Sequence, residues 1–126
     1  MSAAGERIAF CGLKVVCGSD GPQTADLCVT VDGVEARAGS EGNGPVDAVF
    51  NAIRAIVPTM AKLDLYQVHA VTGGTDAQAK VSVRLKGEGI IATGQGADTD
   101  TLVASAKAYI HALNKLEARK AKRLAA

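Results

Sequence analysis

The sequence predicts an α+β fold of two pseudo-symmetric β-β-β-α units, which form a sheet and helix sandwich and pair as a dimer. The same polar and apolar rhythm recurs in segments 25–31 and 77–83, roughly fifty residues apart, as in a chain with an internal repeat. An apolar stripe with helical spacing follows each segment. Two copies of one small unit, neither able to bury its own apolar face, predict one shared core.

Composition excludes several classes of protein. The 126 residues match one ordinary domain, and 14 Lys and Arg balance 13 Asp and Glu to a net charge of +1. With two Tyr, two Phe and no Trp, the chain offers neither the charge nor the stacking surface that nucleic acids require. No apolar run approaches the roughly 20 residues of a membrane span, and the N-terminus lacks the apolar middle of a secretion signal. We expect a cytoplasmic protein without nucleic-acid or membrane partners.

The cysteines and histidines do not predict a metal centre. Cys11, Cys17 and Cys28 are odd in number and lie in strand-like segments, which suits reduced thiols packed as small apolar residues. The sequence has no CxxC or CxH spacing, and His69 and His111 are far apart. We therefore expect no metal ligand and no cofactor.

The first unit is predicted to span residues 12–58. Segment 12–17 is a valine-rich strand, and a second strand around 25–31 alternates between a buried face, formed by Leu27, Val29 and Val31, and a solvent-facing side. Asp32-Gly33 predicts a tight type I′ hairpin turn into a third strand that runs through Ala38. Apolar residues at helical spacing from Val46 to Val57 then predict a helix that ends at Pro58.

The second unit is predicted to span residues 63–117. Its strands are expected at 66–71, 77–85 and 90–93, with a longer hairpin loop at 86–89. Apolar residues from Leu102 to Leu116 recur at three- and four-residue steps, which predicts its helix. Residues 118–126 form a basic tail, whose cations complement the dipole of a helix C-terminus. Exposed sheet edges favour self-association, most simply as a homodimer with twofold symmetry.

The two helices are expected to begin differently. Residues 98–101, Asp-Thr-Asp-Thr, carry side-chain oxygens that can cap the second helix. The first helix has Gly44 at the capping position and Pro45 at its first helical position, so its next N–H groups stay open to a carboxylate or phosphate. The alternative is that Asn43 or water satisfies these donors and the glycines serve a turn. No Lys follows at P-loop spacing, which disfavours phosphate.

Two further residues have competing interpretations. Asp47 is a candidate counterion for an ammonium group beside a bound carboxylate, which would suit an amino acid, or simply a partner of the helix dipole. Tyr66 alternates onto the same side as Val68 and Ala70, which favours a place in the core. Segment 72–76 is a glycine-containing loop between strands, where glycines allow close backbone approach or a turn.

Four segments together resemble a known family. Residues 42–48 (GNGPVDA), 70–79 (AVTGGTDAQA), 94–100 (GQGADTD) and 104–110 (ASAKAYI) are similar, in order and spacing, to the C-terminal regulatory domain of the 2-isopropylmalate synthase family. The similarity runs from about Gly12 to Leu116. It implies a paired β-β-β-α module that dimerises and binds leucine, and so inhibits a separate barrel-shaped catalytic domain in leucine biosynthesis. The chain resembles that domain alone, so we expect no catalytic residues and no enzyme activity of its own.

The resemblance also implies an effector site. The residues expected to hold the polar end of the effector are Gly42, Asn43, Gly44, Pro45, Val46 and Asp47. Those expected around its side chain are Leu63, Tyr66, Ala70 and Ala77.

Three alternatives remain. Related citramalate synthases are regulated by isoleucine. Leucine and isoleucine differ in the position of one methyl group, and the shape of the pocket decides between them with a difference in binding free energy of about 1–3 kcal/mol. A small enzyme with Asp76 or His69 as its base would need a nucleophile and an orienting group that no motif supplies. An RNA-binding sheet would need exposed aromatic residues and a basic surface, which the composition lacks.

Overall fold

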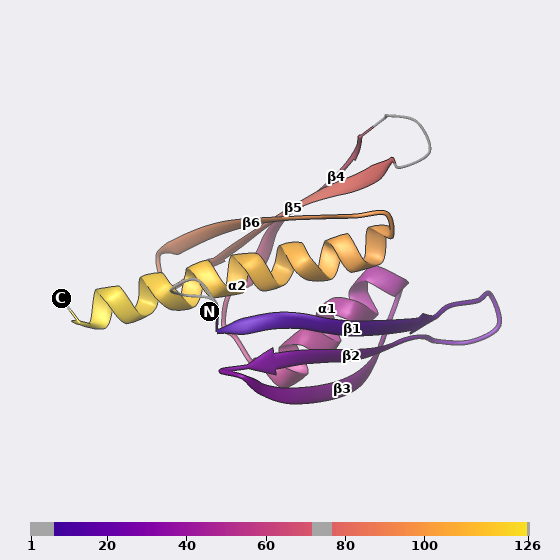
Figure 1. The fold of residues 1–126 in the computed structure, drawn as a ribbon, viewed down its shortest axis with the longest axis horizontal. Helices are drawn as coiled ribbons and strands as arrows, with labels where there is room; N and C mark the ends of the chain where they lie inside the picture. The colour runs from indigo at the N-terminus through magenta and orange to yellow at the C-terminus, as the bar shows by residue number, and fades with distance from the viewer. Residues whose placement is uncertain (1–6, 72–76, 126) are drawn as a thin grey trace. The chain divides into compact units, whose positions relative to one another are not determined.

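A computed structural model describes residues 7–71 and 77–125 of the chain. It divides into two compact units, one formed by residues 8–59 and the other by residues 60–125 together with Arg7. Each unit is a three-stranded antiparallel sheet followed by a helix (Figure 1). The predicted α+β fold with two β-β-β-α units is therefore confirmed. None of the helices in the described ranges is long and apolar enough to cross a membrane.

The unit of residues 8–59 contains β1 (Ile8–Val16), β2 (Gln23–Val31), β3 (Val34–Gly42) and α1 (Pro45–Ile56). The strands lie in the order β1-β2-β3. The alternating residues Ala25, Leu27 and Val29 of β2 are buried, as are five apolar residues of α1. β3 continues four residues beyond the predicted end at Ala38, and β1 begins four residues before the predicted start at Gly12.

The unit of residues 60–125 contains β4 (Lys62–Val71), β5 (Gln78–Gly87), β6 (Ile90–Asp98) and α2 (Thr101–Ala125), with the strands in the order β4-β5-β6. Val81, Val83 and Leu85 alternate in β5 and are fully buried. The basic residues after Leu116 belong to α2, which runs to Ala125.

Both hairpins between the last two strands of a unit close with two-residue turns. Asp32 and Gly33 have φ values of 53° and 85°, as the predicted type I′ turn requires. Glu88 and Gly89 have φ values of 55° and 76° and connect β5 directly to β6. The prediction of a longer loop at 86–89 is wrong. Glu88 adopts a positive φ, which non-glycine residues rarely take, and this allows a two-residue turn.

Glycines let α2 lie directly against the backbone of β6. A Cβ atom added to Gly94 would lie 2.9 Å from Ala112 Cα, and one added to Gly96 would lie 2.6 Å from Ala108 N. The helix meets these glycines with alanines, and Ala104, Ala108 and Ala112 are fully buried. Small residues on both surfaces therefore set the distance between helix and strand.

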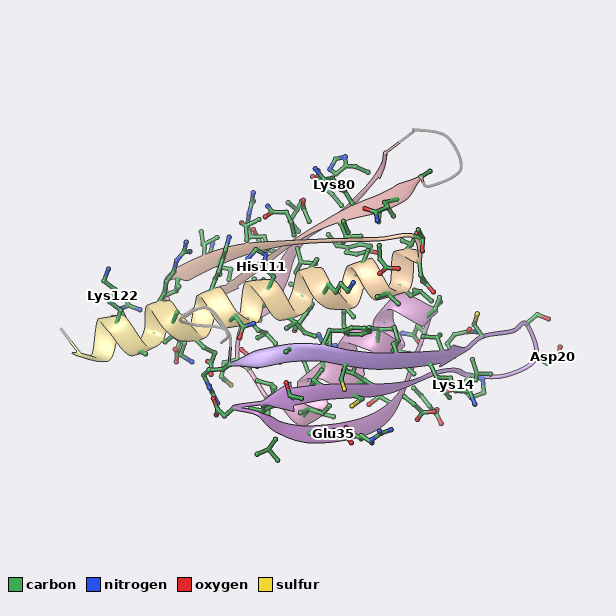
Figure 2. All side chains as sticks on the ribbon, viewed as in Figure 1. Lys14, Asp20, Glu35, Lys80, His111 and Lys122 are labelled. Carbon is green, nitrogen blue, oxygen red and sulfur yellow. The ribbon has the colours of Figure 1, made fainter. Side chains whose placement is uncertain are left out.

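A row of side chains from α2 bonds to backbone groups along the outer edge of β6 and in the turn before it. Lys115 Nζ donates to Thr93 O at 2.9 Å, and His111 Nδ1 accepts from Gln95 N–H at 3.0 Å. Arg119 and Arg123 also donate, to the carbonyl oxygens of Ile91 and Glu88. The bonding residues are four apart along the helix, which is about 6 Å, and mostly two apart along the strand, which is about 6.6 Å. The two spacings therefore nearly match, and successive side chains can reach successive backbone groups. Figure 2 labels His111 on α2 in this row.

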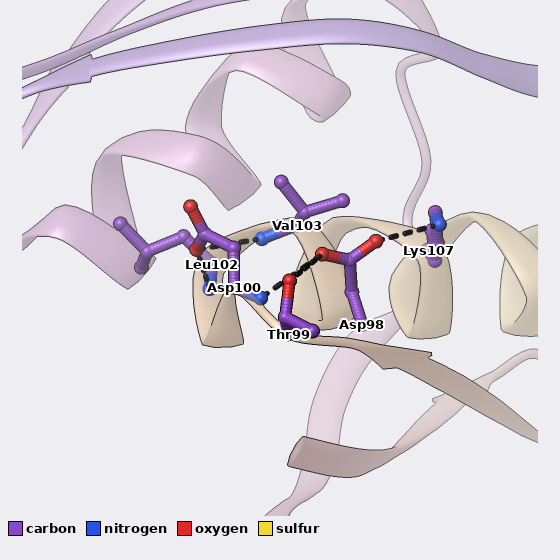
Figure 3. Close-up of polar contacts among 6 residues, drawn as sticks. All are labelled: Asp98, Thr99, Asp100, Leu102, Val103 and Lys107. Carbon is purple, nitrogen blue, oxygen red and sulfur yellow. Dashed lines mark hydrogen bonds and ion pairs between the residues drawn. The ribbon is translucent and has the colours of Figure 1, made fainter. Parts of the chain in front are cut away.

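The start of α2 is capped by its own side chains, as predicted (Figure 3). Asp100 Oδ1 accepts from Leu102 N at 2.8 Å and from Val103 N at 3.4 Å. Asp98 accepts from Asp100 N at 2.9 Å and from Lys107 Nζ at 3.0 Å. The N–H of Asp100, followed by the ammonium of Lys107, lowers the pKa of the Asp98 carboxyl below 3.8.

We predict that Gly94→Ala destabilises the chain, because the added methyl group meets the backbone of α2. The free energy of unfolding should fall by about 1–3 kcal/mol or more, the usual cost of overpacking. Urea denaturation followed by circular dichroism measures this change. Gly12→Ala is the matched control, since Gly12 also lies in a strand but has no atom within 4 Å of the added Cβ position. Equal stability of the two variants would show that α2 does not need this contact.

We also predict an acid-dependent contribution from Asp98. Because its folded-state pKa is lowered, Asp98 stabilises the fold above pH 3.8, and this stabilisation is lost as pH falls through the lower folded-state pKa. Asp98→Asn should therefore have a lower Tm than the wild type at neutral pH, and the two values should converge in acid. Lys107→Ala keeps the Asp100 contact and should have a smaller effect. A Tm difference that stays constant down to about pH 2 would contradict this assignment.

Candidate functional site

The N-terminus of α1 lacks a side-chain cap, as predicted. Gly44 is the capping residue, with φ −155° and ψ 172°, and Pro45 follows at the first helical position. Ala48 N donates to Gly44 O at 3.0 Å, which closes the first turn. Within residues 7–71 and 77–125, no hydrogen-bond acceptor meets the N–H groups of Val46 and Asp47. The positive end of the α1 dipole is thus open, whereas that of α2 is closed.

Asp47 ties the loop before α1 to the first turn of the helix. Its Oδ2 atom accepts from Asn43 N at 2.9 Å, although its side chain lies at the surface. Asn43 therefore contributes a backbone donor to this loop and does not cap the helix. The bond orients the Asp47 carboxylate toward the glycine loop, where a bound ammonium group would need its counterion.

The loop lies close against α1 because Gly42 allows it. A Cβ atom at Gly42 would lie 2.7 Å from the carbonyl carbon of Asp47. Asn51, one and a half turns into α1, donates from Nδ2 to Glu41 O at 2.9 Å and fixes the end of β3 on the helix. Together these contacts hold residues 42–47 in one arrangement.

A surface depression of about 570 Å³ lies beside this loop. Its lining is polar and includes two carboxylates and three amides. The lining residues are Gly21, Pro22, Gln23, Glu41, Gly42, Asn43, Asp47 and Asn51. Such a set can accept hydrogen bonds from an ammonium group, while the open helix N-terminus can donate to a carboxylate.

The predicted site residues fall into two groups, one in each unit. Gly42 to Asp47 are contiguous at the start of α1. The other four belong to the unit of residues 60–125: Leu63 is 42% exposed on β4, Tyr66 is half-buried, and Ala77 is exposed just before β5. Ala70 pairs with Ala79 in the sheet. The loop at 72–76, and with it Asp76, lies outside the described residues.

Ser105 is a partner of Tyr66 that sequence reasoning missed. The hydroxyl groups of Tyr66 and Ser105 lie 2.8 Å apart, and Ser105 Oγ donates to Thr101 O at 2.8 Å. Because Ser105 uses its proton on Thr101, Tyr66 donates to Ser105. Ser105 is fully buried among alanines of α2, and a buried serine inside a helix commonly bonds to the carbonyl four residues back.

We predict that the Tyr66 hydroxyl group stabilises the unit of residues 60–125. Tyr66→Phe should lower the free energy of unfolding by about 0.5–1.5 kcal/mol, because one partly buried hydrogen bond is lost. In a double-mutant cycle with Ser105→Ala, the combined effect should be smaller than the sum of the single effects. Full additivity, measured by urea denaturation, would mean that the two hydroxyl groups do not interact.

Comparison with known proteins identifies the family. Residues 1–117 match the family model of the LeuA allosteric (dimerisation) domain. A 2-isopropylmalate synthase of Caulobacter vibrioides is 61% identical over 122 residues, which are 97% of this chain and 23% of the relative. The synthases of Caulobacter sp. and Nitrobacter hamburgensis are 62% and 60% identical and are covered over 23% and 22% of their lengths.

The chain thus spans about a quarter of the length of the curated relatives that it matches. Its similarity to them covers both β-β-β-α units and both helix starts. On these matches, the chain belongs to the LeuA allosteric (dimerisation) domain family.

Proposed function

We propose that this chain is the regulatory domain of a 2-isopropylmalate synthase, which binds leucine and mediates feedback inhibition of leucine biosynthesis. In this proposal it acts in the cytoplasm as a homodimer and is associated with the barrel-shaped catalytic domain of the synthase, an acyltransferase. Membership in the LeuA allosteric (dimerisation) domain family supports this role. So does the name 2-isopropylmalate synthase carried by relatives about 60% identical to the chain.

The observation that carries the proposal is the contrast between the two helix starts. α2 satisfies its first N–H groups with Asp100, whereas α1 begins at Gly44 without a side-chain cap. An open helix N-terminus stabilises a carboxylate through its free donors and its dipole. We propose that the carboxylate of leucine binds to the N–H groups of Val46 and Asp47.

The charges around the loop favour a zwitterion over a simple anion. Asp47 and Glu41 both line the depression beside the helix start. Two carboxylates would repel a phosphate dianion, but they can hold the ammonium group of an amino acid next to its own carboxylate. Asp47, oriented by its bond from Asn43 N, is the proposed partner of that ammonium group.

The isobutyl group of leucine needs apolar contacts that this polar depression does not supply. Leu63, Tyr66, Ala70 and Ala77 are the residues we propose for them. Their mixture of large and small side chains would leave room for a branched group. Inhibition then requires that the full synthase bind leucine more tightly in its inactive arrangement than in its active one, because a ligand shifts an equilibrium only by its differential affinity.

Calorimetric titration of the chain with leucine, isoleucine and valine tests the proposal. We expect leucine to bind most tightly, with the other two weaker by about 1–3 kcal/mol, the usual value of one displaced or missing methyl group. A preference for isoleucine would assign the chain to the effector domain of a citramalate synthase. Absence of heat with all three amino acids would refute an amino-acid effector.

We predict that Gly44→Asp abolishes leucine binding and leaves the fold intact. Gly44 has an extended φ and no atom within 4 Å of an added Cβ, so a side chain fits there. Aspartate would cap α1 and repel the incoming carboxylate. Gly44→Asn, which can cap without a charge, should weaken binding less, and Gly44→Ala least. Unchanged affinity in the Gly44→Asp variant, with unfolding still cooperative, would rule out this binding mode.

A further inference from the structure

Two cysteines lie side by side on the face of the β1-β2-β3 sheet that α1 does not cover. In β2, Cys28 alternates with Leu27 and Val29, so its thiol is on the face opposite theirs. Gly42, which meets α1, pairs with Gln23 and therefore shares the face of Leu27 and Val29. Cys28 is nevertheless only 6% exposed. The predicted solvent-facing side of this strand is thus covered at Cys28.

A bulge in β1 brings Cys11 to Cys28. Phe10 pairs with Val29 and Gly12 pairs with Cys28, so Cys11 is the extra residue of the bulge. Because Gly12 has no side chain and no atom within 4 Å of its Cβ position, the space beside Cys11 is open. Cys11 and Cys17 are both exposed and Cys28 is buried, so the prediction that the cysteines pack as small apolar residues holds for Cys28 alone.

A carboxylate from β3 completes the cluster. Arg37 pairs with Cys28, and Glu35 precedes Arg37 by two residues, which puts its side chain on the same face. The two sulfur atoms and a carboxylate oxygen of Glu35 all lie within 4.8 Å of one another. Figure 2 labels Glu35 on this sheet. Three strands therefore contribute one potential ligand atom each.

The cluster adjoins an open depression of about 640 Å³ on the same sheet. Cys11, Gly12 and Cys28 are among its lining residues, as are Asp26 and Arg37. The hydrogen bond to Cys11, followed by burial, raises the pKa of the Cys28 thiol to about 11. The Cys28 thiol is therefore protonated at neutral pH when no metal is bound.

We propose that Cys11, Cys28 and Glu35 form a binding site for a thiophilic divalent cation, best matched by Zn²⁺. The ion would take two thiolates and one carboxylate, with water at the fourth position, and the two thiol protons would leave to solvent. Ligand atoms around tetrahedral zinc lie about 3.6–3.8 Å apart, by the usual zinc–ligand lengths. The exposed side chains of Cys11 and Glu35 can close the remaining distance by rotation.

Arg37 supplies a positive charge beside the proposed site. Its Nε atom lies 3.0 Å from Glu35 Oε2, and the Arg37 side chain is 73% exposed. Two thiolates and a carboxylate around a divalent ion carry a net charge of −1, which the adjacent guanidinium neutralises. Arg37 can keep one oxygen of Glu35 while the other oxygen binds the ion, as in the outer shell of many metal sites.

Cobalt is the probe for this site, because thiolate-bound Co²⁺ has an ultraviolet charge-transfer band. We expect the reduced 126-residue chain to bind one Co²⁺ with this band and to release it to Zn²⁺. Cys11→Ser and Cys28→Ser should each abolish the band and weaken Zn²⁺ binding at least tenfold, since loss of a ligand costs no less than loss of an outer-shell contact. Glu35→Gln should weaken binding but keep a cobalt–thiolate band.

Cys17→Ser is the matched control, because Cys17 is exposed and outside the cluster. It should bind Co²⁺ like the wild type. No band in the reduced wild type, or equal loss in all three cysteine variants, would overturn the proposal. The proposal would also be overturned if Cys11 and Cys28 formed a disulfide and the protein still bound no cobalt after that disulfide was reduced. Circular dichroism checks that each variant is folded, and leucine titration of the same variants separates this site from the proposed effector site.

Discussion

The close contact between α2 and the backbone of β6 organises the unit of residues 60–125. Gly94 and Gly96 remove the side chains that would hold the helix away, and alanines of α2 occupy the space. At this short distance Lys115 and His111 reach the backbone of the edge strand. A free strand edge exposes unpaired polar groups and invites pairing with other chains. The row of α2 side chains bonds to backbone groups along this edge, and so the helix both packs on the sheet and shields part of one of its edges.

The two units use the same element order but differ at the start of the helix. Asp98 and Asp100 satisfy the first donors of α2 and anchor it to the end of β6. α1 has Gly44 and Pro45 at the corresponding points, and the carboxylate in its first turn, Asp47, is turned toward the loop backbone at Asn43. Because its own chain caps α2, the start of this helix needs no ligand for its stability. The open start of α1 leaves donors that the proposed effector would satisfy, and such binding would stabilise the folded domain.

The sequence was sufficient for the fold class, because periodicity and turn chemistry act locally. The prediction of strand ends failed where glycines are needed for packing between a strand and a helix. β3 and β6 extend beyond their predicted ends at Ala38 and Thr93. Their last residues are rich in glycine, and in a single sequence such a segment predicts a loop. Gly42, Gly94 and Gly96 instead allow a helix to pack closely against these strands. The Ser105 contact and the cysteine cluster were invisible for another reason: each depends on which residues of different elements face one another, and no spacing in the sequence encodes that.

Gly42 and Gly44 show why resemblance to a motif does not assign a role to each of its residues. Both belong to the glycine loop that the resemblance links to the effector. Gly42 has a packing reason to be glycine, because any side chain there would collide with the backbone of α1 at Asp47 and Ala48. Gly44 has none: its backbone is extended and the space around it is open, so folding alone would accept a capping residue, which would stabilise the helix by about 1 kcal/mol. A substitution at Gly42 would therefore disturb folding and binding together. Gly44 is the position at which the requirement of the proposed ligand can be separated from the requirement of the fold.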